Sequence, residues 1–184
     1  RTSVRVVLLK SSVPKIFCAG ADLKERKGMK EQDVKIFVTR LRRVFNNFSM
    51  LSVPTIACIN GFALGGGLEL SMACDIRLAT KSSVLGLSET SLGIIPGAGG
   101  TQRLPRIVGV AKAKELIYTA AKLTADKSLS IGLINEVFEN ESDLNSKALE
   151  IANNIIKNAP LAIYSAKRAI DEGAFEPMHM GLKV

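Results

Sequence analysis

The sequence predicts an α/β domain with buried strands, and three observations support this fold class. Val4–Lys10 and Thr55–Ile59 are short, largely apolar runs with β-branched residues, which is typical of strands covered on both faces. Apolar side chains between residues 34 and 48 recur at three- and four-residue spacing, which predicts an amphipathic helix. Strand, helix and strand then alternate as they do in layered α/β folds.

The other elements follow in order along the chain. Phe17–Asp22 is small and glycine-bearing, which predicts a turn, and the charged segment Lys24–Lys30 leads from it to the helix. The polar face of that helix carries Lys35, Arg42 and Arg43. Thr124 can cap a later helical turn, and Pro160 suits a first helical position. Further strands are expected at Asp75–Ala79, Val84–Leu87 and Ile134–Phe138, and helices at Leu68–Ala73, Thr101–Arg106, Ala111–Ala120, Ser142–Asn158 and Pro160–Glu172.

Length and composition indicate a single domain with a substantial core. The chain has 184 residues, of which 47% are hydrophobic, and no run approaches the ~18–20 apolar residues of a membrane span. Arg1 leads directly into a strand-like run, so we expect an internal piece of a longer domain, without a signal peptide.

The net charge of +8 comes from the first quarter of the chain. Residues 1–50 hold 12 Lys and Arg against 4 Asp and Glu, which leaves 13 of each for the remaining residues. Such asymmetry is compatible with a phosphate-bearing ligand, with nucleic acid or an acidic partner, and equally with a solvated helix face.

Cysteine and histidine usage does not indicate a metal site. Cys18, Cys58 and Cys74 are an odd set without CxxC spacing, and each lies in an apolar stretch, so we expect buried thiols in a reducing compartment. The single histidine, His179, lies in a methionine-rich tail and is a poor candidate for catalysis.

The most informative segment is Ile56–Ile76, in which three glycines, Gly65–Gly67, follow a strand and precede a helix. Glycine lets a ligand approach the backbone closely, and a helix N-terminus presents unpaired N–H groups and a positive dipole end. The nucleotide motif GxxxxGK[ST] is absent, and GxGxxG occurs only loosely. A developing oxyanion is therefore a better match than a nucleotide phosphate.

Two glutamates near these glycines are candidate acid–base groups. Glu69 lies in the first turn of the glycine-led helix among apolar neighbours, where a carboxylate must be buried or line a cavity. Glu89 is the only charged residue between Ser82 and Thr101, a stretch that ends in a second glycine turn, Gly97–Gly100. Taken separately, each could also be an ordinary helix-terminal or solvated loop acid.

Three blocks of the sequence resemble the enoyl-CoA hydratase/isomerase (crotonase) family over essentially the whole chain. They are FCAGADLKE, the segment Ile56–Ile76 with Asn60, Gly61, Cys74 and Asp75, and GIIPGAGGTQRLPR. The wording of these blocks is most similar to the AU-binding methylglutaconyl-CoA hydratase and enoyl-CoA hydratase domain-containing group.

The resemblance implies a crotonase-like spiral of ββα units with C-terminal helices, incomplete here at both ends, and a trimer or hexamer. It implies that the amides of Ala21 and Gly66 form an oxyanion hole, that Glu69 and Glu89 are catalytic, and that the Gly97 backbone places the water. The acyl-CoA thioester is the expected partner, with no separate cofactor and no metal. The substrate path is implied along Ala19, Ala21, Asp22, Leu23, Lys24 and Gly66.

The implied reaction is hydration of a 2-enoyl-CoA through an enolate. Each oxyanion donor is worth about 3–4 kcal/mol, and positioned proton transfer contributes about 10²–10⁴-fold. A Δ3,Δ2-enoyl-CoA isomerase is the nearest alternative, although it commonly needs one carboxylate. RNA binding and a scaffold role are alternatives of other classes, but stacking aromatics are scarce, with no Trp and two Tyr. Mitochondrial (matrix) location, fatty acid metabolism and leucine degradation are implied by resemblance only.

Overall fold

The computed structural model describes residues 3–22 and 28–183 and shows two four-stranded sheets. The first sheet has the order β1-β3-β5-β8 and is parallel throughout. The second has the order β2-β4-β6-β7, with only β7 antiparallel to its neighbour. The strands are β1 (Val7–Leu9), β2 (Ile16–Cys18), β3 (Thr55–Ile59), β4 (Phe62–Leu64), β5 (Ile76–Thr80), β6 (Val84–Gly86), β7 (Lys122–Thr124) and β8 (Glu136–Phe138).

Successive strands alternate between the two sheets, and helices separate the strand pairs. β1 and β2 precede α2, β3 and β4 precede α3, and β5 and β6 precede η1 and α4, which confirms the predicted spiral of ββα units. The helices are α2 (Glu31–Ser49), α3 (Gly66–Met72), the 3-10 helix η1 (Glu89–Leu92), α4 (Gly100–Val108), α5 (Val110–Tyr118), α6 (Ala125–Ser130), α7 (Glu141–Ile156), α8 (Pro160–Gly173) and α9 (Met178–Gly181).

The fully buried strand β3 separates two parts of the core. Ala57 and Ile59 face the main cluster, which also contains Leu68 of α3 and Leu85 of β6. The alternate residues of β3 face a second cluster with α7, because successive side chains of a strand point to opposite faces. The burial of both faces explains why this strand is apolar throughout.

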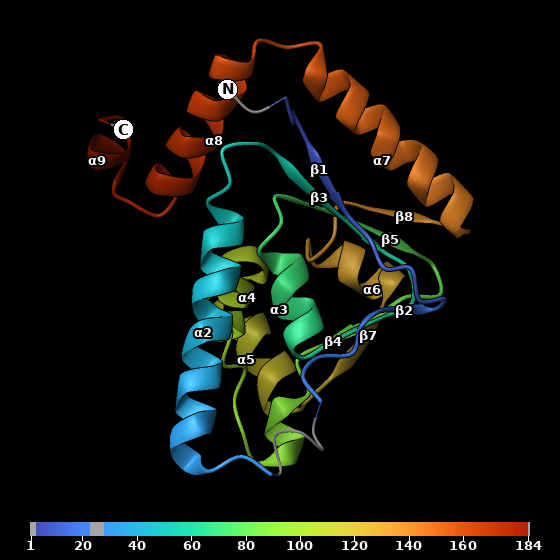
Figure 1. Cartoon of the computed structure of the whole chain (residues 1–184), viewed down its shortest axis with the longest axis vertical. Helices are drawn as coiled ribbons and strands as arrows, with labels where there is room; N and C mark the ends of the chain where they lie inside the picture. Colours follow the sequence, from blue (N-terminus) through green and yellow to red (C-terminus); the bar gives the residue numbers. More distant parts are fainter. Residues whose placement is uncertain (1–2, 23–27, 184) are drawn as a thin grey trace.

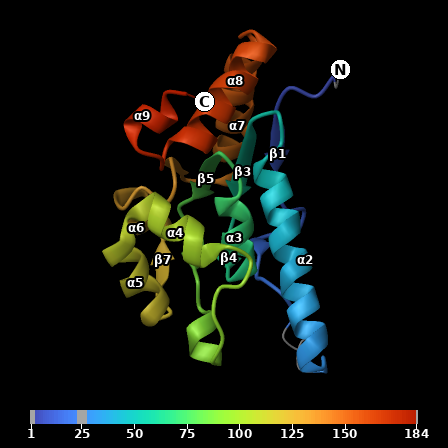
Figure 2. The ribbon, with the colours of Figure 1, turned by 90° about the vertical axis from the view of Figure 1, so that its left-hand side faces the viewer.

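Helix α2 and the C-terminal helices border this core differently. Figure 1 shows α2 running beside α3, and Figure 2 shows α7, α8 and α9 gathered at one end of the molecule. Phe45 of α2 is buried against Ala73 and Ala98, whereas α8 buries none of its side chains fully. No helix in the described part of the chain is long and apolar enough to cross a membrane.

Two strand assignments differ from the sequence prediction. Ile16–Cys18 forms β2, although Phe17–Asp22 was predicted as a turn, and only the residues after Cys18 leave the strand. Phe62–Leu64 forms β4 between two positive-φ glycines, where the sequence indicated a direct run into the helix. Both strands are three residues long, and pairing with neighbours distant in sequence stabilises them more than local propensity does.

Some smaller elements differ from the sequence prediction, whereas two predicted helix-end features are confirmed. The helix after the glycines begins at Gly66 rather than Leu68, Glu89 begins η1 rather than lying in an open loop, and β7 was not predicted. The predicted cap is confirmed, since the Thr124 hydroxyl accepts a hydrogen bond from the Lys127 amide at 3.3 Å. The predicted first helical position of Pro160 is confirmed as well.

The three cysteines are free thiols, as predicted, but their burial differs. Cys58 and Cys74 are buried, whereas Cys18 is only half-buried at the end of β2. Burial raises the pKa of the Cys74 thiol to about 12, which keeps it protonated and unreactive at neutral pH.

A buried arginine ties the end of α3 to the first sheet. Arg77 of β5 is 8% exposed, and its Nε donates to the Leu133 carbonyl at 2.8 Å. Its Nη1 donates to the carbonyls of Cys74 at 2.7 Å and Ser71 at 3.4 Å. A cation at these carbonyls also complements the negative dipole end of α3.

We expect Arg77→Met to lower the free energy of unfolding by about 2–4 kcal/mol, because buried carbonyl groups lose their donor. Urea denaturation of the full-length protein measures this loss. Arg40→Met, at an exposed position of α2, is the matched control and should change stability little. Equal stability of the two variants would contradict the role of Arg77.

Candidate active site

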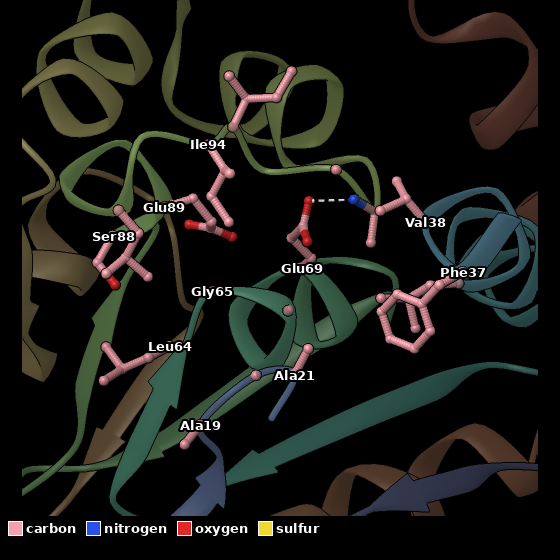
Figure 3. A pocket seen from close by; sticks show the side chains of 17 residues that line it. Ala19, Ala21, Phe37, Val38, Leu64, Gly65, Glu69, Ser88, Glu89 and Ile94 are labelled. Atoms are coloured by element: carbon pink, nitrogen blue, oxygen red, sulfur yellow. Dashed lines mark hydrogen bonds between the residues drawn. The ribbon is translucent and has the colours of Figure 1, made fainter. Parts of the chain in front are cut away.

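The candidate site is a pocket between α3, α2, the segment after β2 and the loop that joins η1 to α4. β2 and β4 are parallel neighbours, so the segments that follow them, Ala19–Ala21 and Gly65–Gly66, leave the same edge of the sheet. Figure 3 shows the side chains of Glu69 and Glu89 in this pocket, above the backbone at Gly65 and Ala21. The strand pairing therefore brings together residues far apart in sequence.

Glu69 lies in the first turn of α3 and is 2% exposed. Its Oε1 accepts hydrogen bonds from the amides of Gly100 at 2.7 Å and Ala98 at 2.9 Å, the latter drawn in Figure 3. These amides come from the second glycine turn, so the turn holds the carboxylate at the wall of the pocket. The two glycine-rich segments of the sequence therefore meet at Glu69.

The electrostatic environment of Glu69 favours a carboxyl group that can exchange protons. Burial raises the pKa of Glu69 above its ordinary value, although the amides of Gly100 and Ala98 and the charges of Arg103 and Arg42 act in the opposite direction. A carboxyl group whose pKa is raised is a stronger base when ionised, and a general base works best near the operating pH.

Glu89 begins η1, and it lines the same pocket as Gly65 and Glu69. A Cβ built on Gly65 would lie 3.2 Å from Glu89 Oε1, and Gly65 has φ of +52°. This backbone conformation favours glycine, and a side chain here would also displace the Glu89 carboxylate slightly. Figure 3 shows the Glu69 and Glu89 carboxylates facing the same space.

The two proposed oxyanion donors lie close together. A Cβ built on Gly66 would lie 4.0 Å from the Ala21 amide nitrogen, and both residues line the pocket. Gly66 occupies the first position of α3, where the amide has no partner within the helix. The arrangement can therefore supply backbone N–H groups to an anionic oxygen.

Two arginines hold the second glycine turn, and the sequence did not single out either of them for the site. Arg42 Nε donates to the Gly97 carbonyl at 3.0 Å, and Arg103 Nη1 donates to the Ala98 carbonyl at 3.1 Å. The sequence placed Arg42 on the polar face of the predicted helix and left open whether that face binds a ligand or is solvated. The only local signal was its position one turn after Val38, which lines the pocket.

The apolar stripe of α2 is also only partly core. Phe37, Val38 and Leu41 line the pocket together with Leu64 and Ile94. Periodicity alone cannot distinguish a core face from a pocket wall, because both are apolar. These side chains form an apolar wall, against which an apolar group can lie beside the two carboxylates.

Most of the predicted site residues meet in this pocket. Glu69, Glu89, Ala21, Gly66 and Gly97 all line it, as does Ala19 of the predicted substrate path. Asp22 is exposed and is not among the described lining residues, while Leu23 and Lys24 lie outside the described residues. Across residues 3–22 and 28–183, no group of three or more His, Cys, Asp and Glu side chains is arranged to hold a metal ion.

This fold defines a class of α/β protein with two alternating sheets, in which backbone amides and two carboxylates line one pocket. The family model for enoyl-CoA hydratase/isomerase matches residues 1–183, and the chain belongs to that family. It is 49% identical over 184 residues to "Methylglutaconyl-CoA hydratase, mitochondrial" of Rattus norvegicus, covering 98% of this chain and 58% of that protein. It is 50% identical over 182 residues to "Probable enoyl-CoA hydratase 2, mitochondrial" of Arabidopsis thaliana, covering 99% and 60%.

Solved structures agree with this assignment. The crystal structure of an enoyl-CoA hydratase from Bacillus anthracis has a TM-score of 0.96 and 50% identity, covering 100% of this chain and 70% of that one. An enoyl-CoA hydratase structure from Thermoplasma volcanium has a TM-score of 0.91 at 30% identity, covering 100% and 72%. The chain thus spans about three fifths of the length of the rat and Arabidopsis relatives.

Adjacent glycines provide a test of how tightly the site is packed. A Cβ on Gly67 would lie 1.9 Å from the Cys18 carbonyl oxygen, whereas the nearest atom to one on Gly66 is at 3.7 Å. We expect Gly67→Ala to cost about 3 kcal/mol or more, because β2 must move, and Gly66→Ala to change stability by about 1 kcal/mol or less. Thermal or urea unfolding measures both, and similar losses would show that β2 does not constrain α3.

Proposed function

We propose that this chain carries the active site of an enoyl-CoA hydratase, which adds water reversibly to the double bond of a 2-enoyl-CoA thioester. The observation that carries the proposal is the Glu69 carboxylate held by two amides, with Glu89 entering the same pocket. The family membership and the names of the rat and Arabidopsis relatives support it.

In the proposed reaction, the thioester oxygen binds between the amides of Ala21 and Gly66. Glu69 takes a proton from a water molecule placed with the help of the Gly97 backbone, and the water oxygen bonds to C3. The electrons of the double bond move toward the thioester, whose oxygen becomes an enolate stabilised by the two amides. Glu89 then donates a proton to C2, and proton exchange through solvent returns both carboxyl groups to their starting states.

In the proposed reaction, carboxyl groups and backbone amides do all the chemistry, so neither a metal nor a separate cofactor is needed. Coenzyme A enters only as part of the substrate. The apolar wall formed by Phe37, Val38 and Leu41 suits the acyl chain, because contact with these side chains removes apolar surface from water. The chemical class of the substrate is therefore an acyl-CoA thioester with a 2-enoyl group.

We further propose a mitochondrial matrix location and assembly into a trimer or hexamer. The rat and Arabidopsis relatives carry "mitochondrial" in their names. Large apolar side chains are exposed on the C-terminal helices and their linkers, which is typical of an interface: Leu161, Phe175, Met178 and Leu182.

The first test replaces each proposed catalytic carboxylate by its neutral amide. We expect Glu69→Gln and Glu89→Gln each to lower kcat for hydration of crotonyl-CoA by about 10²–10⁴-fold, because each removes a positioned proton-transfer group. Glu150→Gln, at an exposed position of α7, is the control and should leave kcat unchanged. Full activity of Glu89→Gln would exclude its assigned role, provided that circular dichroism shows folded variants.

The second test separates hydration from isomerisation. Isomerisation moves only a proton, whereas hydration must both activate water and protonate carbon, so two carboxylates favour hydration. We expect the full-length protein to consume 2-enoyl-CoA with higher kcat/KM than 3-enoyl-CoA. Assays with crotonyl-CoA, methylglutaconyl-CoA and a 3-enoyl-CoA of equal chain length measure this ratio. Faster turnover of the 3-enoyl substrate would identify an isomerase instead.

A further inference from the structure

The loop Gly97–Gly100 uses its amides and its carbonyls for different partners. The amides of Ala98 and Gly100 hold Glu69 Oε1 at 2.9 Å and 2.7 Å. The carbonyls of Gly97 and Ala98 accept from Arg42 at 3.0 Å and Arg103 at 3.1 Å. Because a peptide plane is rigid, holding a carbonyl also orients the amide of the next residue.

Arg42 binds the same peptide unit that donates a hydrogen bond to Glu69. The Gly97 carbonyl and the Ala98 amide belong to the same peptide unit, so the Arg42 hydrogen bond and the Glu69 hydrogen bond lie at its two ends. Val38, one turn earlier on α2, adds a second contact, since a Cβ on Gly97 would lie 2.9 Å from Val38 Cγ1. The loop therefore contacts α2 at two residues, Arg42 and Val38.

We propose that Arg42 is a positioning residue for the hydration reaction: it binds the Gly97 carbonyl and so aims the Ala98 amide at Glu69. The inference rests on the proposed function of this pocket but concerns a side chain that does not line it. Polarisation of the peptide by the guanidinium also strengthens the Ala98 amide as a donor.

The charges around Glu69 determine the direction of the expected pH effect. Arg42 on α2 and Arg103 on α4 face it as cations, and Glu89 of η1 lies in the same pocket. The positive charge of Arg42 lowers the pKa of Glu69, against the larger effect of burial. Removal of Arg42 therefore raises this pKa further, and the acid limb of kcat/KM moves to higher pH, since Glu69 must be ionised to accept a proton.

The experiment compares Arg42→Met, Arg42→Lys and the control Arg43→Met in the full-length protein. Arg43 is the exposed neighbour on α2 and loses the same charge. Because Arg42 is solvent-accessible, we expect a moderate fall in kcat of roughly three- to tenfold in Arg42→Met, with KM little changed. The acid limb should move to higher pH in Arg42→Met and return toward the wild-type position in Arg42→Lys, which keeps the charge.

Hydrogen–deuterium exchange separates this inference from the proposed function. We expect the Ala98 and Gly100 amides to exchange several-fold faster in Arg42→Met than in Arg43→Met, whether or not the wild-type protein hydrates crotonyl-CoA. An inactive wild type with this exchange difference would reject the hydratase function but keep the positioning role. Equal exchange and equal pH profiles in the two Met variants would overturn the inference. If Arg42→Met does not fold, Arg42→Ala takes its place with the same expected losses, and wild-type kcat and exchange in that variant would overturn the inference.

Discussion

The structure depends most on the two hydrogen bonds that the amides of Ala98 and Gly100 donate to Glu69. A carboxylate that is 2% exposed is costly to bury, and these short bonds offset part of that cost. The same bonds connect α3 to the loop before α4, so the two glycine-rich segments form one unit. Burial also raises the pKa of Glu69, which suits the proton transfer that we propose for it.

The alternation of strands between two sheets explains how the remaining parts of the site come together. β2 and β4 lie side by side and parallel, so their following segments supply the backbone at Ala21 and Gly66 from one edge of the sheet. Gly67 allows α3 to approach the Cys18 carbonyl, which no side chain would permit. The backbone of the site is thus placed by sheet pairing and close packing, and α2 adds the apolar wall.

Sequence patterns predicted the longer elements and some of the short strands, namely β1, β6 and β8. The amphipathic helix corresponding to α2 and the buried strand β3 have strong periodicity or continuous apolar character. The sequence missed β2, β4 and β7, whose three residues each pair with strands distant in the chain. The spacing of the apolar residues predicted α2 but did not indicate that Phe37, Val38 and Leu41 line the pocket, because a core face and a pocket wall are both apolar.

The sequence by itself determined the α/β class, the family resemblance, and the candidate residues Glu69, Glu89 and Gly66, because these depend on local residue type and spacing. Only the tertiary structure showed that the amides of the second glycine turn hold Glu69 and that Arg42 holds that turn. These contacts join residues between 29 and 55 positions apart. No local pattern encodes such a distance, since it is the packing of α2, α3 and the loop that closes it.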